Sequence, residues 1–121
     1  MFTADAASHA LGIDIVELAA GRAVATMTVT DVMVNGYGMT HGGFVFSLAD
    51  TAFAMACNSH DHRAVAAHAD IRFIAASQLG DELRAEAVER ARYGRNGLYD
   101  VSVWRDDTLI AEFRGQSRAV S

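Results

Sequence analysis

Residues 41–58 read HGGFVFSLADTAFAMACN and predict the one long helix of this chain. The stretch is rich in Ala, Leu, Met and Phe, and it has no glycine after Gly43, as expected for a helix. Thr40 is predicted to cap its amino end. Because the helix is apolar on nearly every face, it must be covered on all sides. A curved sheet wrapped around it would provide that cover.

The two segments before this helix alternate apolar and polar residues, as β-strands do, and the rest of the chain after it is also expected to be β. Two strands are predicted before the helix and four after it, in the order ββαββββ, with turns at Ala20-Gly21 and Asp106-Asp107. The fold class is therefore α+β, with one domain over residues 1–121 and an antiparallel sheet around a central helix. The predicted strands are 12–18, 22–30, 64–75, 81–93, 97–105 and 108–119, with a short helix at 3–10 and a loop at 31–40.

The composition argues against several classes of protein. Ten basic and 15 acidic residues give a net charge of −5, whereas a nucleic-acid partner requires a basic face. The single cysteine, Cys57, cannot form an intrachain disulfide, which fits a cytoplasmic protein, and its neighbours predict a buried thiol. The apolar run at 44–57 is interrupted by Asp50 and two hydroxyl residues, so no membrane span is expected. The first ten residues lack the features of a signal peptide.

Asp50 is the anomaly of the predicted helix. An unpaired carboxylate among apolar residues costs several kcal/mol, so such a residue is either functional or paired with a cation. Gly42 and Gly43 are a second anomaly, because glycine is a poor helix former. In the first helical turn they let another molecule approach the free N–H groups, which suit an oxyanion.

Helix geometry separates these two features. His41 and Asp50 are nine residues apart, about 13–14 Å along the axis and about half a turn out of phase. They cannot meet in one protomer. If both serve one reaction, a second protomer must bring its Asp50 to this Gly42, as a two-fold dimer with two shared sites would do.

Three stretches carry a resemblance to a known family. They are NGYGMTHGGFVFSLADTAFAMACNS around the helix, ALGIDIVEL followed by GRAVATMTVTDVMVNG upstream, and the strands containing GLYDV and AEFRG near the end. The chain resembles the hotdog-fold thioesterases of the phenylacetic acid degradation PaaI type over nearly its whole length. The spacing of Asn35, His41-Gly42-Gly43 and Asp50 is the specific part of the match.

The resemblance implies a hotdog fold and hydrolysis of an acyl-CoA, such as phenylacetyl-CoA or a ring-hydroxylated form, to free acid and coenzyme A. It implies that the Gly42 N–H polarises the thioester carbonyl and that Asn35 and His41 seat it. Asp50 of the facing protomer would activate water or attack directly. No metal or other cofactor is implied, and the dimers are expected to pair into tetramers. The further substrate-binding residues expected are Gly43, Phe44, Phe46, Thr51, His68 and Arg95.

Two departures from the family bear on the substrate. Related enzymes often carry Ser or Thr on the strand after the helix, but here it reads AVAAHADIRF, with His68 and Asp70 as its polar residues near the centre. The Arg-Pro pair common at the end of that strand is replaced by Ala75-Ala76.

Simpler interpretations stay open for each candidate. Asp50 could pair with an arginine, His41 could help to cap the helix, and Asn35 could be a turn residue before Gly36. The two glycines could serve packing alone. For the whole chain, the alternatives are a hotdog domain that binds acyl-CoA without turnover, or an acyl dehydratase or hydratase.

Two polar groups outside the helix have alternatives of their own. His60, His62 and His68 could be metal ligands, but a polar turn after the helix explains the first two better. Arg90, Arg92 and Arg95 flank a predicted turn and are either solvated or in contact with coenzyme A phosphates.

Overall fold

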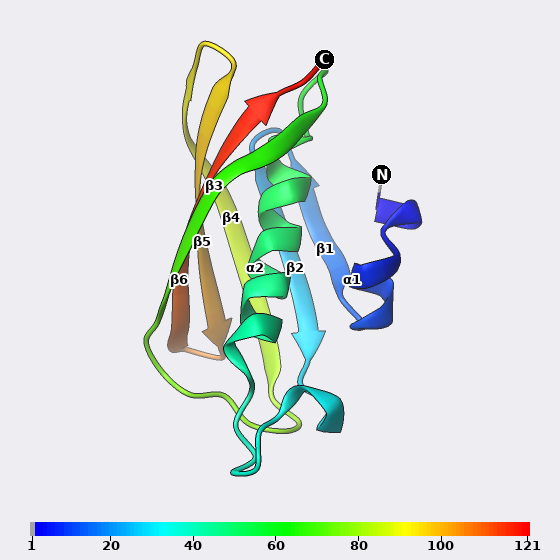
Figure 1. The fold of residues 1–121 in the computed structure, drawn as a ribbon, viewed down its shortest axis with the longest axis vertical. Helices are drawn as coiled ribbons and strands as arrows, with labels where there is room; N and C mark the ends of the chain where they lie inside the picture. The colour runs from blue at the N-terminus through cyan, green and yellow to red at the C-terminus, as the bar shows by residue number, and fades with distance from the viewer. Residues whose placement is uncertain (1) are drawn as a thin grey trace.

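The computed structural model describes residues 2–121 and confirms a curved antiparallel sheet around one long helix (Figure 1). The helix α2 spans Gly42–Cys57 and lies along the inner face of the sheet. The strands are β1 (Asp14–Ala19), β2 (Arg22–Thr28), β3 (Ala64–Phe73), β4 (Glu82–Tyr93), β5 (Asn96–Arg105) and β6 (Thr108–Ala119). All seven elements agree with the sequence prediction to within two residues at each end.

The strand order in the sheet is β1-β2-β4-β5-β6-β3, so the strand that follows the helix crosses to the far edge. β4, β5 and β6 form a continuous antiparallel meander, and β3 pairs with β6 from Ala64↔Ala119 to Phe73↔Ala111. This crossing carries the end of β3 past the start of α2, which places residues 73–77 beside the helix amino end.

The core lies between α2 and the inner face of the sheet. Leu48, Ala52 and Phe53 of the helix are almost fully buried there, together with alternate residues of β4, β5 and β6. Phe53 packs against Tyr99 and Phe113, with ring centroids 5.6 and 5.7 Å apart. Burying side chains of this size contributes most of the stability of such a layer.

The prediction that the helix is covered on every side is wrong for the single chain. The sheet covers one side of α2, and the short helix α1 (Ala6–Ala10) lies along its flank (Figure 1). The remaining face, which includes Asp50 and Ala54, is only half-buried. This face needs a further partner if the helix is to be enclosed.

The predicted cap of the helix is also wrong. His41, not Thr40, occupies the N-cap position, with extended backbone angles and no side-chain hydrogen bond to the helix. The Thr40 hydroxyl is instead engaged by Ser77, whose Oγ donates to Thr40 Oγ1 over 2.7 Å. The N–H groups of the first turn therefore have no side-chain cap.

The two short predicted segments differ in detail. Residues 3–10 form two pieces, the 3-10 turn η1 (Phe2–Ala4) and α1, because Asp5 caps the second. The loop at 31–40 contains the 3-10 turn η2 (Asp31–Met33) and two isolated β-bridges, Val34↔Thr40 and Met39↔Gln78. Among residues 2–121, no helix has both the length and the apolar content that crossing a membrane requires.

Candidate functional site

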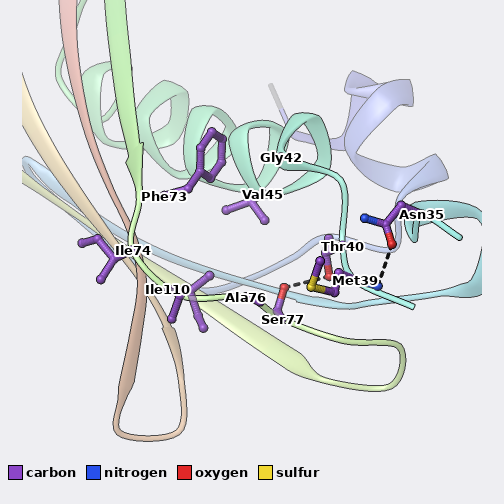
Figure 2. A pocket seen from close by; sticks show the side chains of 11 residues that line it. Asn35, Met39, Thr40, Gly42, Val45, Phe73, Ile74, Ala76, Ser77 and Ile110 are labelled. Atoms are coloured by element: carbon purple, nitrogen blue, oxygen red, sulfur yellow. Dashed lines mark hydrogen bonds between the residues drawn. The ribbon is translucent and has the colours of Figure 1, made fainter. Parts of the chain in front are cut away.

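A pocket of about 430 Å³ lies at the amino end of α2, and we call it the Gly42 pocket (Figure 2). The 35–40 loop, the first turns of α2, and the chain after β3 enclose it. Its walls are largely apolar, and its polar side chains come from the loop and from the chain after β3. The apolar residues include Met39, Val45, Phe73, Ile74 and Ile110, and the polar ones are Asn35, Thr40 and Ser77.

Asn35 has a role in the loop and a place in the pocket. Its Oδ1 accepts hydrogen bonds from the N–H groups of Tyr37 and Met39, at 2.9 and 3.1 Å. These two bonds fix the orientation of the amide and leave its NH₂ group free to donate. In Figure 2 this nitrogen points to the side of the helix start. The turn role that the sequence left open is therefore real, and it presents a donor to the pocket.

Gly42 is held against the ring of Phe73. A Cβ built on Gly42 would lie 2.7 Å from Phe73 Cζ, so no larger residue fits without movement of the ring. The same test at Gly43 finds no atom within 4 Å. Gly42 is thus required by a close contact, whereas Gly43 is exposed and lies outside the pocket lining.

A second pocket, of about 300 Å³, surrounds Asp50 and is called the Asp50 pocket. Phe46, Thr51 and Ala54 of α2 line it on one side, and Asp5 and Ser8 of the α1 region line it on the other. Burial raises the pKa of Asp50, and the negative charge of Asp5 raises it further. No arginine lies among the residues that line this pocket, so the pairing with a cation that the sequence left open does not occur there.

The two pockets share no residue, although both lie on α2. Gly42 and Asp50 therefore cannot act on one bond within a single chain, as the helix geometry predicted. Of the predicted site residues, the structure brings Asn35 to Gly42, and it brings Phe46 and Thr51 to Asp50.

Other predicted site residues lie outside both pockets. His41 is exposed at the helix cap, and Phe44 is half-buried. His68 lies on β3 with 67% of its side chain exposed, 3.7 Å from Asp70.

Arg95 also lies outside both pockets. Its guanidinium donates to the carbonyl of Ala119 at 2.9 and 3.3 Å. The β4–β5 turn that carries it is at the opposite end of the molecule from the start of α2 (Figure 1). Within one chain, Arg95 therefore cannot reach a thioester bound at Gly42.

The histidine-rich turn has the structural role that the sequence favoured. His60 Nε2 lies 2.7 Å from Glu89 Oε1, and its ring stacks on His62 at a centroid distance of 5.9 Å. Tyr99 donates to the same Glu89 oxygen over 2.8 Å. Burial alone would raise the pKa of Glu89, but the hydrogen bonds from Tyr99 and His60 outweigh it, and the pKa lies below its usual value. Among residues 2–121, no group of three or more His, Cys, Asp or Glu side chains is placed to hold a metal ion.

Cys57 is buried, as predicted, and its thiol donates to the carbonyl of Ala54. Burial raises the pKa of this thiol to about 11. It is therefore protonated near neutral pH and unsuited to nucleophilic chemistry.

Sequence reasoning missed two sets of residues around these pockets. Phe73 and Ser77 face Gly42 and Thr40 from a segment more than 30 residues later in the chain. Asp5 and Ser8 reach the Asp50 pocket from a five-residue helix. Only tertiary contacts reveal these positions, although the N-cap pattern of Asp5 and Ser8 was visible in the sequence.

Comparison with known proteins places this chain among thioesterases. Residues 37–112 match the thioesterase superfamily. The chain is 46% identical over 121 residues to the acyl-coenzyme A thioesterase PaaI of Escherichia coli (strain K12), with 99% of this chain and 86% of that protein covered.

Solved structures agree. That of the E. coli PaaI protein from the phenylacetic acid degradation operon has a TM-score of 0.97 at 45% identity, covering 100% of this chain and 88% of the other. A mutant of the phenylacetic acid degradation protein PaaI from Thermus thermophilus has a TM-score of 0.89 at 34% identity, covering 92% and 96%.

Proposed function

Because this chain belongs to the thioesterase superfamily and is an acyl-CoA thioesterase, we propose that it hydrolyses phenylacetyl-CoA or a ring-hydroxylated derivative at a site shared by two protomers. One observation carries this proposal. The two chemical features of α2, the free N–H groups at Gly42 and the carboxylate of Asp50, line different pockets of the same chain.

The Gly42 pocket seats the thioester carbonyl. The Gly42 N–H at the uncapped helix start donates to the carbonyl oxygen, and the positive end of the helix dipole stabilises the negative charge that develops there. The free NH₂ of Asn35 supplies a second donor from the loop. His41, whose side chain does not cap the helix, is free to contact the substrate at the pocket entrance.

Asp50 of the second protomer supplies the base or the nucleophile. As a base, it removes a proton from water while the water oxygen attacks the thioester carbon. The tetrahedral intermediate then collapses, the C–S bond breaks, and the proton passes from Asp50 to the departing sulfur. The products are the free acid and coenzyme A. As a nucleophile, an Asp50 oxygen would attack the thioester carbon, and the C–S bond would break to give an anhydride and the coenzyme A thiolate. Water would then hydrolyse the anhydride to the free acid and the Asp50 carboxylate, and the proton released would convert the thiolate to coenzyme A.

The β3 edge of the sheet is the surface that suits this dimer. Seven of the ten β3 residues are exposed, including Val65 and Phe73, and the outer edge of the strand has no partner strand in the sheet order. The opposite edge strand, β1, has six residues against ten in β3, and each of the two strands has one bulge, after Ile15 and after Ala66. A long edge with exposed apolar side chains favours pairing with another strand.

Antiparallel pairing of two β3 strands also fits the split site. It sets the Phe73 end of one strand beside the Ala64 end of the other. Phe73 contacts Gly42, so the Gly42 pocket of each protomer then faces its partner. In the same assembly the partner protomer covers the half-buried face of α2 that carries Asp50. Pairing of these dimers into tetramers is part of the proposal.

The acyl group occupies the apolar part of the Gly42 pocket. A volume of about 430 Å³ is in the usual range for small-molecule sites. Thr40 Oγ1 already accepts a hydrogen bond from Ser77, so the Thr40 hydroxyl is available to donate one to a ring hydroxyl of the substrate. This hydroxyl pair takes the place of the Ser or Thr that the strand after the helix lacks.

The proposed reaction needs no metal or other cofactor, and coenzyme A enters only as part of the substrate. The proposed location is the cytoplasm, where acyl-CoA thioesters are available. Gly43, Phe44, Phe46, Thr51, His68 and Arg95 stay as proposed substrate contacts. For His68 and Arg95, such contacts would have to be made in the assembled oligomer.

A panel of acyl-CoA thioesters, followed by release of the free thiol, tests the proposal. The panel contains phenylacetyl-CoA, hydroxyphenylacetyl-CoA, benzoyl-CoA and a series of straight-chain acyl-CoA compounds. We expect the highest kcat/KM for the two arylacetyl compounds. Binding without thiol release from any compound would identify an acyl-CoA-binding domain instead. A clear preference for long straight chains would contradict the proposed substrate.

A further inference from the structure

The short helix α1 forms one wall of the Asp50 pocket. Asp5 is its N-cap, and the Asp5 carboxylate accepts hydrogen bonds from both the backbone N–H and the hydroxyl of Ser8, at 3.0 and 2.7 Å. Ser8 is only 3% exposed. The Asp5 carboxylate is therefore held in one orientation at the wall that faces Asp50.

A chain of hydroxyl groups ties Asp5 to the helix that carries Asp50. Ser8 Oγ lies 2.9 Å from Thr51 Oγ1, and both residues are buried. Each hydroxyl has a single proton to donate. The charged Asp5 oxygen is the stronger acceptor for the Ser8 hydroxyl, so Ser8 Oγ can accept a hydrogen bond from Thr51. The Thr51 hydroxyl also lies within donating distance of the Ser47 carbonyl, at 2.9 Å. α1 is thus attached to the turn of α2 that contains Asp50.

Few charged groups act on Asp50 within residues 2–121. From α1, Asp5 contributes a negative charge, and from α2, the Cys57 thiol is neutral near neutral pH. His9, the other titratable residue of α1, is turned to the carbonyl of Phe2, with its Nε2 at 2.9 Å. Among the described residues that line the pocket, none is a cation that would offset the two carboxylates.

We propose that Asp5 is a positioning residue for the reaction, whose fixed negative charge makes Asp50 a stronger proton acceptor or nucleophile. The inference rests on the proposed catalytic role of Asp50. A stronger base takes a proton from water more readily, at the cost of needing a higher pH to be ionised. Burial and the Asp5 charge both raise the pKa of Asp50. The N-terminal segment is then part of the active site, as well as a cover for α2.

The test uses Asp5→Asn, because asparagine caps helices as well as aspartate does but has no charge. Asp107→Asn is the matched control, since it removes a carboxylate from the exposed turn between β5 and β6. A third variant, Ser8→Ala, keeps the Asp5 charge but removes the hydroxyl that holds it. The profile of kcat/KM against pH is measured for each with phenylacetyl-CoA. The Asp50 carboxyl is titrated by ¹³C NMR in the substrate-free protein and assigned with Asp50→Asn.

We expect the acid limb of the Asp5→Asn profile and the NMR midpoint of Asp50 to move together to lower pH. Asp107→Asn should match the wild-type protein, and Ser8→Ala should move in the same direction as Asp5→Asn but less. If a folded Asp5→Asn protein keeps the wild-type limb and midpoint, the proposal is wrong. If the pH profile of Ser8→Ala matches that of the wild-type protein, Ser8 has no part in holding the Asp5 charge. If the wild-type protein releases no thiol, the proposed function fails, whereas the NMR midpoints still decide whether Asp5 acts on Asp50.

Discussion

The ring of Phe73 lies against the backbone of Gly42, so that a Cβ at Gly42 would come within 2.7 Å of Phe73 Cζ. The contact joins the end of β3 to the start of α2. Phe73 is 56% exposed, so its ring can move away when it is pushed. The contact therefore controls the shape of the Gly42 pocket more than it controls folding.

Gly42→Ala is expected to lower kcat/KM by about tenfold or more, because small displacements in a site have effects of that size. Its melting temperature should change less than its activity, since the close contact is with the outer end of a flexible side chain. Gly43→Ala is the matched control for crowding within the chain, because a Cβ at Gly43 meets nothing within 4 Å, and it should lower kcat/KM less than Gly42→Ala does. Equal losses in the two variants would show that the Phe73 contact is irrelevant.

A second pair of variants isolates the N–H group from the steric effect. In a Phe73→Ala background, Gly42→Ala keeps the backbone N–H and Gly42→Pro removes it. Proline is tolerated at the first helical position, and His41 already has the extended backbone that precedes proline. Losing one oxyanion donor costs about 10²–10³ in kcat. Similar kcat values for the two double variants would exclude a role for this N–H.

Asp50→Asn is expected to lower kcat by at least about 10²-fold, the lower bound for loss of a general base, with substrate binding largely retained. It should also raise the melting temperature at neutral pH. The pKa of Asp50 is raised in the folded protein, so its contribution to stability is present below the unfolded pKa and is lost as pH rises through the folded value. At neutral pH the ionised carboxylate is therefore a cost, which asparagine removes.

Melting curves from about pH 3 to 8 test whether ionised Asp50 lowers the stability of the fold, because this range extends below the unfolded pKa of Asp, about 3.9. The gain from Asp50→Asn should shrink as the pH falls from the raised folded pKa of Asp50 toward that value, and it should be absent below it. A variant that is both active and less stable at neutral pH would identify Asp50 as a structural residue.

Glu89→Ala is expected to reduce the free energy of unfolding by about 1–3 kcal/mol, because it leaves the buried Tyr99 hydroxyl without its acceptor. The folded pKa of Glu89 is lowered, so its contribution is present above the unfolded pKa and is lost as pH falls through the folded value. The difference in free energy of unfolding between Glu89→Ala and the wild-type protein should therefore narrow as the pH falls through the folded pKa of Glu89. Glu82→Ala, on an exposed position of the same strand, is the control and should be near neutral. Denaturant unfolding at several pH values measures both.

Activity is expected to survive EDTA and dialysis, because the histidines that invite a metal have another role. His60 is bound to Glu89, and His68 is on the exposed edge strand. Thiol release before and after chelation checks this, with added zinc as the reverse test. Loss of activity that zinc restores would contradict the proposed mechanism.

The strands and the helix were predictable from the sequence because their patterns are local. Alternation marked β1 and β2, and a long stretch rich in helix-forming apolar residues marked α2. The order of strands across the sheet and the crossing of β3 depend on which surfaces pack together, and no local pattern carries that information. The cap at His41 was missed for the same reason, since Ser77, far away in the chain, engages Thr40.

The residues of the candidate site also fall into those that the sequence predicted and those that only the fold reveals. Gly42 and Asp50 stood out as anomalies of one helix, and their separation followed from helix geometry alone. Phe73 and Asp5 had no anomaly to mark them, because a phenylalanine at a strand end and an N-cap aspartate are ordinary. Arg95 was selected for its charge, but the hydrogen bonds to Ala119 and the position of its turn separate it from both pockets.

Mixed dimers test whether Gly42 and Asp50 of different protomers form one site. Asp50→Asn lacks the carboxylate, and the Gly42→Pro, Phe73→Ala double variant lacks the N–H donor. A mixed dimer of the two has one site with both groups intact and one site with neither. Equal mixing should restore about one quarter of wild-type activity, because half of the dimers are mixed and each has one intact site, and the isolated mixed dimer should have about one half. The variants are co-expressed with different tags, and thiol release is measured on the doubly tagged species and on each parent. Mixing the folded parents without subunit exchange is the control. If the doubly tagged species is no more active than the parents, the two groups do not act across the dimer, and the shared site proposed for this thioesterase is wrong.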